Sequence, residues 1–241
     1  MSLTAEEEQT FHDQGFLLKK NLFPAAWMAQ IREECADIHR RMAADAPADV
    51  HIAWVDPDNP IMIHQLMNSD LVSPTMNRIL RSEALLDIVA DLIGPNVSLY
   101  HSKLLPKSAG SALAIPWHQD YAYWKRDDNR PLMINAMLAI DPATRENGCL
   151  EFIPGSHAWG LQEHERHKEA FGLFLPGHYH ERPESARVDM EPGDVNFFTS
   201  LVIHGSAPNL SNADRWANTF AYNVTGNNVQ QCREVLRGMQ L

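Results

Sequence analysis

The sequence predicts a mainly β protein with flanking α-helices, and two observations support this fold class. From about residue 96 onward, short apolar runs of strand length recur between Gly, Pro, Asn and Asp residues, whereas helix-period patterns are concentrated before that point. Many short strands with turn signals between them are typical of a β-sandwich or a closed double sheet such as a jelly roll. No linker divides the 241 residues, so we expect one domain over 1–241, with a helical part at about 1–95 packed on a β core at about 96–225.

The first 95 residues are expected to form three helices. Thr4, followed by an acidic run, predicts an N-cap at the positive end of a helix dipole, and Gly15 ends that helix. Apolar residues at spacings of three and four predict a second helix from Pro24 to about Ala43. A third extends from Met76 to about Ile93, before Gly94-Pro95. Between the helices we expect a short strand at 16–18, a loop at 43–59, and an apolar run at 61–67 that fits neither class.

The second half of the chain is expected to supply the strands. Eight runs of apolar and β-branched residues have strand length: Val97–Leu105, Leu113–Trp117, Leu132–Ile140, Cys149–Ile153, Ala186–Met190, Val195–Thr199, Leu201–His204 and Trp216–Val224. The segment from Ala158 to Pro183 is predicted to be a long insertion between strands, of the kind that often forms binding loops.

Charge and cysteine usage exclude several classes of function. A net charge of −11 and a pI near 5.5 argue against nucleic-acid binding or anionic-membrane binding, both of which need basic patches. Cys35, Cys149 and Cys232 are widely spaced without a CxxC pair, so neither a disulfide framework nor a zinc ribbon is expected. The acidic N-terminus has no signal-peptide pattern, and no apolar run is long enough to cross a bilayer. We expect a soluble cytoplasmic protein.

His118 and Asp120 are the first candidates for a functional site. Two residues apart on a strand, both side chains would point to the same face and could provide two ligands to a divalent metal. His204 is the best candidate for the third ligand, since two histidines and one carboxylate form the facial triad of non-haem Fe(II) oxygenases. Arg215 follows eleven positions after His204. Each of these four residues alone would more often be structural or exposed to solvent. Their combination in a β-rich half of the chain points to a functional site.

Around these residues the sequence resembles the phytanoyl-CoA dioxygenase family. The resemblance extends from about Phe11 to Asn223 and rests on six successive motifs: Trp117–Tyr121, Ala139–Thr144, Glu146–Leu150, Ile153–His157, Pro192–Asp194 and His204–Asn209. It implies a double-stranded β-helix, the cupin-like form of the jelly roll, and an oxygenase that depends on Fe(II), 2-oxoglutarate and O2. Ascorbate would then serve as reductant in assays.

The resemblance also assigns roles to individual residues. His118, Asp120 and His204 match the iron ligands, and Arg215 matches the arginine that pairs with the distal carboxylate of 2-oxoglutarate, a role that suits its planar bidentate cation. Further cosubstrate contacts are expected from Ser206 and from Asn135, which stands where relatives often have a small hydroxyl residue. Lys103 would face the cosubstrate or the substrate if it is not a surface lysine. Candidates for the substrate pocket are Met62, His64, Tyr123 and Trp124, although a methionine or aromatic cluster is more often plain core.

The predicted function is hydroxylation of an unactivated C–H bond in a small metabolite, such as an amino acid or a natural-product intermediate, with release of succinate and CO2. The Asp120 carboxylate favours hydroxylation, because related halogenases have a small residue there to admit halide. Two alternatives stay open. The same iron chemistry could give desaturation, cyclisation or epoxidation, or the chain could be a catalytically silent cupin-like protein that binds a metal and a ligand.

Overall fold

Two antiparallel sheets form the body of the chain in a computed structural model, which describes residues 2–45, 47–54, 63–166, 172–177, 179, 184–227 and 233–238. The larger, eight-stranded sheet has the order β1-β11-β6-β13-β4-β3-β2, and β14 also pairs with β4. Its strands in that order are β1 (Phe16–Lys19), β11 (Val195–Thr199), β6 (Ile134–Ala139), β13 (Arg215–Val224), β4 (Val97–Lys107), β3 (Ile63–Met67), β2 (Ile52–Trp54) and β14 (Glu234–Arg237).

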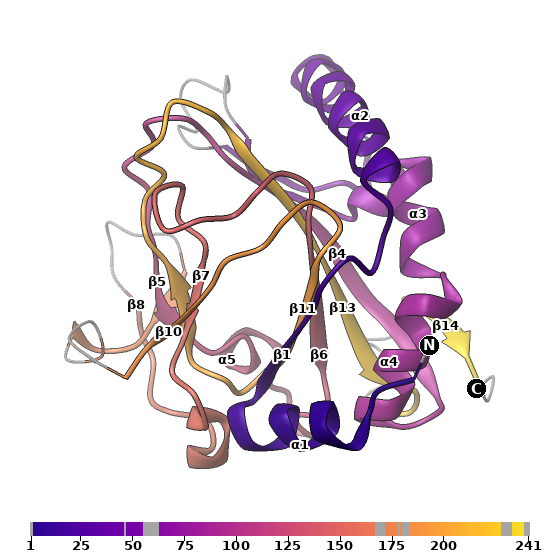
Figure 1. Cartoon of the computed structure of the whole chain (residues 1–241), viewed down its shortest axis with the longest axis vertical. Helices are drawn as coiled ribbons and strands as arrows, with labels where there is room; N and C mark the ends of the chain where they lie inside the picture. The colour runs from indigo at the N-terminus through magenta and orange to yellow at the C-terminus, as the bar shows by residue number, and fades with distance from the viewer. Residues whose placement is uncertain are drawn as a thin grey trace.

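The smaller sheet lies opposite the larger one (Figure 1). It has four strands in the order β10 (Ala186–Val188), β7 (Leu150–Phe152), β12 (His204–Ser206) and β5 (Ile115–His118). A separate pair consists of β8 (Glu165–Arg166) and β9 (Leu173–Phe174). This arrangement confirms the predicted mainly β class with a jelly-roll core.

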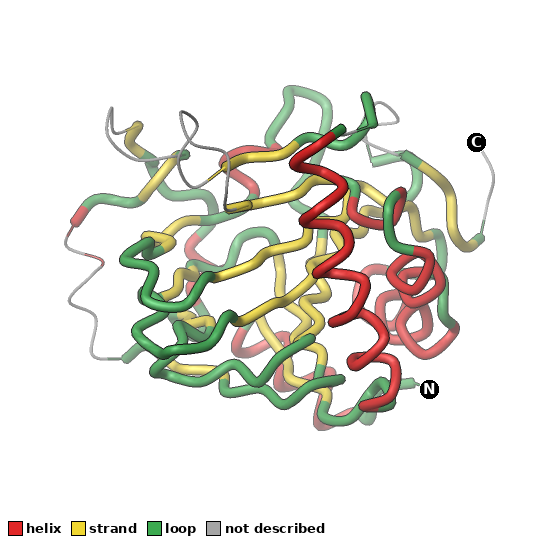
Figure 2. Tube along the Cα trace, turned by 90° about the horizontal axis from the view of Figure 1, so that it is seen from above, coloured by secondary structure: helices red, strands yellow, loops and turns green. Residues whose placement is uncertain are grey.

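The longer helices cover the outer face of the larger sheet and gather on one side of the molecule (Figure 2). They are α1 (Ala5–Gln14), α2 (Ala25–Ala44), α3 (Pro74–Leu80) and α4 (Glu83–Ile93). The short helix α5 (Tyr121–Trp124) packs in a separate cluster, and η1 (Ser69–Leu71) and η2 (Ser156–Trp159) are short 3-10 turns. The main core joins fully buried helix residues such as Ile31, Ile79 and Ile88 to Leu104 and Phe220 of the sheet.

The strands of the larger sheet divide their side chains between this core and the space between the sheets. Along β6, Ile134, Ala136 and Leu138 pack toward the helices, whereas Met137 and Ala139 belong to the inner cluster that also holds Phe152 of the smaller sheet. This alternation follows from the two-residue period of a strand. The inward positions of β4, β6 and β13 are therefore the ones that can build a site.

The N-terminal half departs from the expectation in three places. The single helix predicted from Met76 to Ile93 is two helices, because Ser82 adopts an extended conformation and begins α4 as its N-cap. The expected loop at 43–59 contains β2, and the unassigned run at 61–67 contains β3. Since β1 pairs with β11 and β3 pairs with β4, the N-terminal part contributes strands to the sheet itself as well as helices packed on it.

Most of the other predicted elements agree more closely, but the strand expected at Leu201–His204 is wrong, because β12 begins only at His204 and ends at Ser206. Helix α1 has the expected cap: the Thr4 hydroxyl accepts from the Glu7 backbone N–H, and Gly15 takes the left-handed conformation with φ 83°. Among the described residues, no helix is both long and apolar enough to cross a membrane.

Candidate metal centre and cosubstrate pocket

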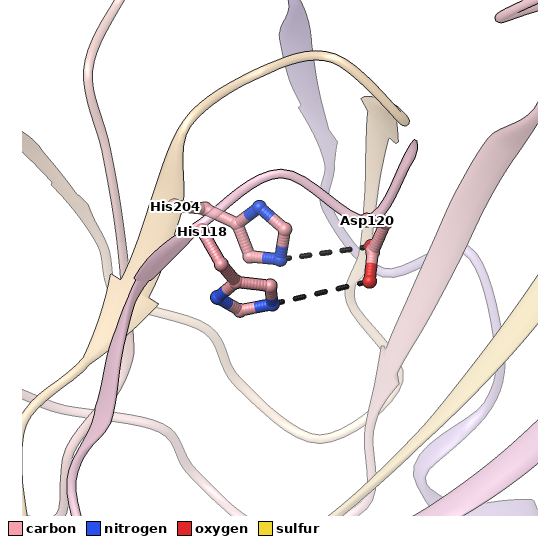
Figure 3. Close-up of side chains that lie close together, drawn as sticks. All are labelled: His118, Asp120 and His204. Carbon is pink, nitrogen blue, oxygen red and sulfur yellow. Dashed lines mark ion pairs between the residues drawn. The ribbon is translucent and has the colours of Figure 1, made fainter. Parts of the chain in front are cut away.

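His118, Asp120 and His204 come together between the two sheets. His118 and His204 are directly paired residues on the antiparallel strands β5 and β12, and their ring centroids lie 4.2 Å apart. The Asp120 carboxylate faces both rings, with Oδ1 3.9 Å from His118 Nε2 and Oδ2 3.7 Å from His204 Nε2 (Figure 3). One potential ligand atom from each residue lies within 4.8 Å of the others, and all three residues are buried.

The route by which Asp120 reaches this position differs from the expectation. Strand β5 ends at His118, and Asp120 has helical backbone angles (φ −58°, ψ −32°) at the start of α5. The shared strand face that we predicted for the pair is therefore wrong, and a tight turn brings the carboxylate to the imidazoles instead. The turn is held by the Tyr121 N–H, which donates to Ser200 O at 2.9 Å, and by the buried Gln119 amide, which donates to Leu201 O at 2.6 Å.

Both imidazoles are oriented for metal binding through Nε2. His118 Nδ1 lies 2.9 Å from Pro116 O, and His204 Nδ1 lies 3.1 Å from Val202 O. A carbonyl oxygen only accepts, so each Nδ1 carries the proton and each Nε2 presents a lone pair toward Asp120. Burial, with His204 close by, lowers the pKa of His118 to about 3, and burial also lowers the pKa of His204, so both rings are neutral ligands. This donor set fits Fe(II).

Asn135 on β6 holds the carboxylate from the opposite sheet. Its Nδ2 donates to Asp120 Oδ2 at 2.7 Å. Burial alone would raise the pKa of Asp120, but the charge of Lys103 and this hydrogen bond help to keep the pKa below its ordinary range. Asn135 was predicted to contact the cosubstrate. It lines the cavity, and its side-chain amide is directed to Asp120, as expected of a residue that orients a ligand.

Two cations lie side by side at another end of the same cavity. Arg215 begins β13 and is directly paired with Lys107 at the end of β4, and both side chains are buried. Lys107 Nζ donates to Ser206 Oγ at 2.7 Å and to Ala207 O, while Arg215 Nη2 donates to Gly148 O at 3.0 Å. Arg215 Nε is buried and has no hydrogen-bond partner among the described residues. Burial lowers the pKa of Arg215 to about 10, and burial beside Arg215 lowers the pKa of Lys107 to about 7.

Lys107 was not among the residues predicted from the sequence. The strand was expected to end at Leu105, two residues too early, so the alternation that places Lys103, Leu105 and Lys107 on one face was cut short. A longer strand with the same period would have revealed it.

The cavity between the sheets measures about 150 Å³ and includes most of the predicted site residues. Its lining contains the three candidate ligands and all four residues predicted to contact the cosubstrate, which are Lys103, Asn135, Ser206 and Arg215. Of the residues predicted for a substrate pocket, His64 lines it as well; burial and nearby Lys107 lower the pKa of His64.

The remaining pocket candidates lie elsewhere. Tyr123 and Trp124 are outside the cavity lining: the Tyr123 ring lies edge-on to His118 with centroids 6.2 Å apart, and Trp124 is buried beside Tyr100 and His101. Met62 falls outside the described residues, and the structure therefore does not place it.

Comparison with known proteins gives one family. Residues 11–217 match the model of the phytanoyl-CoA dioxygenase (PhyH) family. The peroxisomal phytanoyl-CoA dioxygenase of Homo sapiens is 30% identical over 231 residues, which cover 89% of this chain and 67% of the human protein. The ectoine dioxygenase of Bordetella parapertussis is 26% identical over 249 residues, covering 94% of this chain and 77% of that protein.

A solved structure shows the same fold. The crystal structure of EctD from S. alaskensis with 2-oxoglutarate and 5-hydroxyectoine matches with a TM-score of 0.78 at 22% identity, covering 99% of this chain and 86% of that one.

Proposed function

The chain belongs to the phytanoyl-CoA dioxygenase family of Fe(II)- and 2-oxoglutarate-dependent oxygenases, and from this premise we propose that it hydroxylates an unactivated carbon of a small metabolite. The observation that carries the proposal is the triad of His118, Asp120 and His204 in one cavity with the buried Arg215. A metal site and a guanidinium whose Nε has no hydrogen-bond partner among the described residues, both lining one cavity, suit a metal-bound dicarboxylate cosubstrate.

The triad residues would hold the iron. Each imidazole is fixed by a backbone carbonyl at Nδ1, and Asp120 is fixed by Asn135, so the three ligand atoms are oriented before the metal arrives. Three protein ligands leave other coordination positions open. Iron, 2-oxoglutarate and O2, when bound, would supply the chemistry that oxidises a substrate C–H bond to C–OH. In the same reaction 2-oxoglutarate would be converted to succinate and CO2.

Arg215, Lys107 and Ser206 would bind the distal carboxylate of 2-oxoglutarate. The Lys107 ammonium and the Ser206 hydroxyl are joined at 2.7 Å, and Arg215 lies on the neighbouring strand at the same level. A carboxylate placed here would provide Arg215 Nε with the partner that it lacks and would neutralise adjacent buried cations. These contacts would fix the cosubstrate at the end remote from the metal.

The surroundings suit a small substrate in the cytoplasm. A cavity of about 150 Å³ is below the volumes typical of sites for drug-sized ligands. Cys35 and Cys149 are buried free thiols, as is usual for a protein in a reducing compartment. We therefore favour a compact metabolite and a cytoplasmic location.

Succinate formation tests the proposal. The chain with Fe(II), ascorbate, O2 and 2-oxoglutarate, alone and with a panel of small metabolites, should form succinate and CO2 in equal amounts. Asp120→Ala should abolish this turnover, whereas Asp45→Ala, which removes an exposed carboxylate after α2, should retain it. The absence of succinate from the wild-type chain under all these conditions would refute the proposal and favour a non-catalytic binding protein.

A further inference from the structure

Lys103 extends into the cavity without an ionic partner. It lies on β4, half-buried, and lines the cavity together with His118, Asp120 and Thr219. Within the described part of the chain, its ammonium has no hydrogen bond and no ion pair; it contacts the ring of Trp124, whose centroid lies 5.7 Å from Nζ. A half-buried ammonium that borders a cavity and makes no ion pair with the described residues is available for a ligand.

Trp124 fixes where this charge lies. The indole is buried and contacts the rings of Tyr100 and His101 edge-on, with centroids 5.3 and 5.4 Å away. A cation against an aromatic face is attracted to it but keeps its full charge. The indole therefore positions the Lys103 ammonium without neutralising it.

Lys103 lies at the end of the cavity that contains His118 and Asp120, away from the end that contains Arg215 and Lys107. On β4 it is four residues from Lys107, a separation of about 13 Å along a strand. Across the sheet Lys103 is paired with Thr219, whereas Lys107 is paired with Arg215. Lys103 also contributes to the lowered pKa of Asp120, as a cation near the triad would.

A count of charges shows that the metal and the cosubstrate leave the cavity positive. Its described lining has three basic side chains, Lys103, Lys107 and Arg215, and one carboxylate, Asp120, a net of 3 − 1 = +2 when Lys107 is protonated, the form that a bound cosubstrate carboxylate favours. A ferrous ion adds two positive charges and 2-oxoglutarate two negative ones, so they cancel. The excess persists in a chain whose overall charge is −11. A buried positive excess favours a further anionic ligand.

We propose that the substrate carries a carboxylate, which pairs with Lys103 while the carbon to be hydroxylated faces the triad. This inference rests on the proposed function and specifies its substrate class. A single ammonium on a residue paired with Thr219, which also lines the cavity, matches one negative charge, and the described lining has no guanidinium at this end that would favour a phosphate dianion. The metal-bound carboxylate of the cosubstrate is a weaker partner for Lys103, because the ferrous ion already neutralises it.

The experiment compares matched probes in the succinate assay. The panel consists of L-amino acids and other small carboxylic acids, each with its primary amide and its phosphonic acid analogue. At least one acid should raise succinate formation above the rate without substrate, and its amide should need a concentration about tenfold higher or more. Lys103→Met should raise the KM for that acid by about tenfold or more, while the cosubstrate KM should change less than about threefold. Lys103→Arg should restore most of the loss, and Lys20→Met, which removes an exposed lysine, should match the wild type.

Three outcomes would overturn the proposal. The first is that succinate forms, without substrate or with another compound of the panel, but no acid raises its rate. The second is that amides or phosphonates stimulate turnover as well as the acids do. The third is that Lys103→Met raises the KM values for acid and cosubstrate equally, which would assign Lys103 to the cosubstrate. Failure of the proposed function is distinguishable from all three, because the wild-type chain would then form no succinate with any compound.

Discussion

Arg215 and Lys107 are the residues whose burial is hardest to explain by stability alone. Both cations lie on the inner face of the larger sheet without a carboxylate partner among the described residues, and burial depresses the pKa of each. Removing a charge from water without pairing it costs several kcal/mol. Such a cost persists at sites where a ligand supplies the missing charge, and a dicarboxylate cosubstrate would do so here.

Replacing Arg215 by Leu should separate cosubstrate binding from metal binding. The variant loses the guanidinium that would pair with the distal carboxylate, so 2-oxoglutarate should bind about a hundredfold more weakly, as expected for a buried charge-assisted pair. Iron affinity should change little, because no triad atom is touched. Calorimetric titration of each ligand checks this, with Arg40→Leu on the exposed face of α2 as the control. Equal 2-oxoglutarate affinity in the Arg215 variant and the wild type would remove Arg215 from the anchor.

Replacing Lys107 by Met should weaken cosubstrate binding without weakening the fold. The methionine keeps most of the volume but removes an ammonium whose burial is costly, so 2-oxoglutarate should bind about tenfold more weakly while the ligand-free chain unfolds at the same temperature or higher. Thermal unfolding and calorimetry report the two effects. A loss of stability larger than about 1 kcal/mol would mean that the hydrogen bonds of Lys107 to Ser206 and Ala207 are structural.

The pH dependence gives an independent measure of the same residue. In the folded chain the pKa of Lys107 is about 7, lowered from an ordinary 10.5 by burial and Arg215, so the unfolded chain binds more protons between these values and stability should rise with pH across that window. A carboxylate beside Lys107 favours its charged form, so 2-oxoglutarate affinity should be highest below pH 7 and fall as pH rises above it. In Lys107→Met, the contribution of Lys107 to the pH dependence of stability and to the pH dependence of 2-oxoglutarate affinity should both be lost.

At the scale of elements, the turn at residues 145–148 before β7 supports Arg215 and Lys107, the cations proposed to bind the distal carboxylate of 2-oxoglutarate. Gly148 has φ +75°, and a Cβ there would lie 2.2 Å from Ala207 O and 2.9 Å from Lys107 Nζ. Its carbonyl also accepts from Arg215 Nη2. The turn therefore packs against both cation-bearing strands so closely that only glycine fits.

Gly148→Ala should damage both the fold and the cosubstrate pocket. The left-handed backbone alone costs about 1–2 kcal/mol for alanine, and displacement of Lys107 and Ala207 should add to it. Gly226→Ala is the matched control, because Gly226 has φ +87° but no described residue other than its chain neighbours lies within 4 Å of a Cβ placed there. Chemical unfolding should show a larger loss of stability for Gly148→Ala than for Gly226→Ala. Titration with 2-oxoglutarate should show a loss of affinity in Gly148→Ala only. Equal losses in both variants would mean that backbone strain alone is responsible.

The comparison of elements also explains what the sequence could predict. Strands with unbroken alternation, such as Val195–Thr199, were predicted to the residue, since one face meets the helices and the other the inner space. The break between α3 and α4 was missed because the apolar pattern continues through Ser82, although Ser82-Glu83 is itself an N-cap signal. The turn that brings Asp120 to the histidines is held by distant partners, Ser200 and Leu201, and no local pattern encodes it.

At the scale of the whole molecule, each of the two sheets supplies a part of the site. The smaller sheet supplies His118 and His204, and the larger sheet supplies the cations together with Asn135, which joins the two by its hydrogen bond to Asp120. The molecule is acidic overall, with a net charge of −11, yet the cavity between its sheets is cationic. Binding of the metal and its cosubstrate should therefore stabilise the contact between the sheets.

Ligand binding should raise the unfolding temperature of the chain. Each ligand at about a hundredfold excess over its Kd adds about 2.7 kcal/mol, and for a chain of this size 1 kcal/mol corresponds to about 2–4 °C. Fe(II) with 2-oxoglutarate under anaerobic conditions adds both contributions and should thus raise the midpoint by about 10–20 °C, and a chelator should reverse the shift. An unchanged midpoint at saturating concentrations would contradict a cavity built for these ligands.

The central claim is that His118, Asp120 and His204 hold one iron with its cosubstrate, and an anaerobic Fe(II) titration in the presence of 2-oxoglutarate tests it most directly. The visible absorption of the iron–cosubstrate chelate should saturate at one Fe(II) per chain. In His204→Ala and in Asp120→Ala it should be lost or need at least about a hundredfold more iron. His51→Ala, which removes an exposed histidine, should match the wild type. Saturation at one iron with unchanged affinity in both triad variants would place the metal elsewhere and contradict the account.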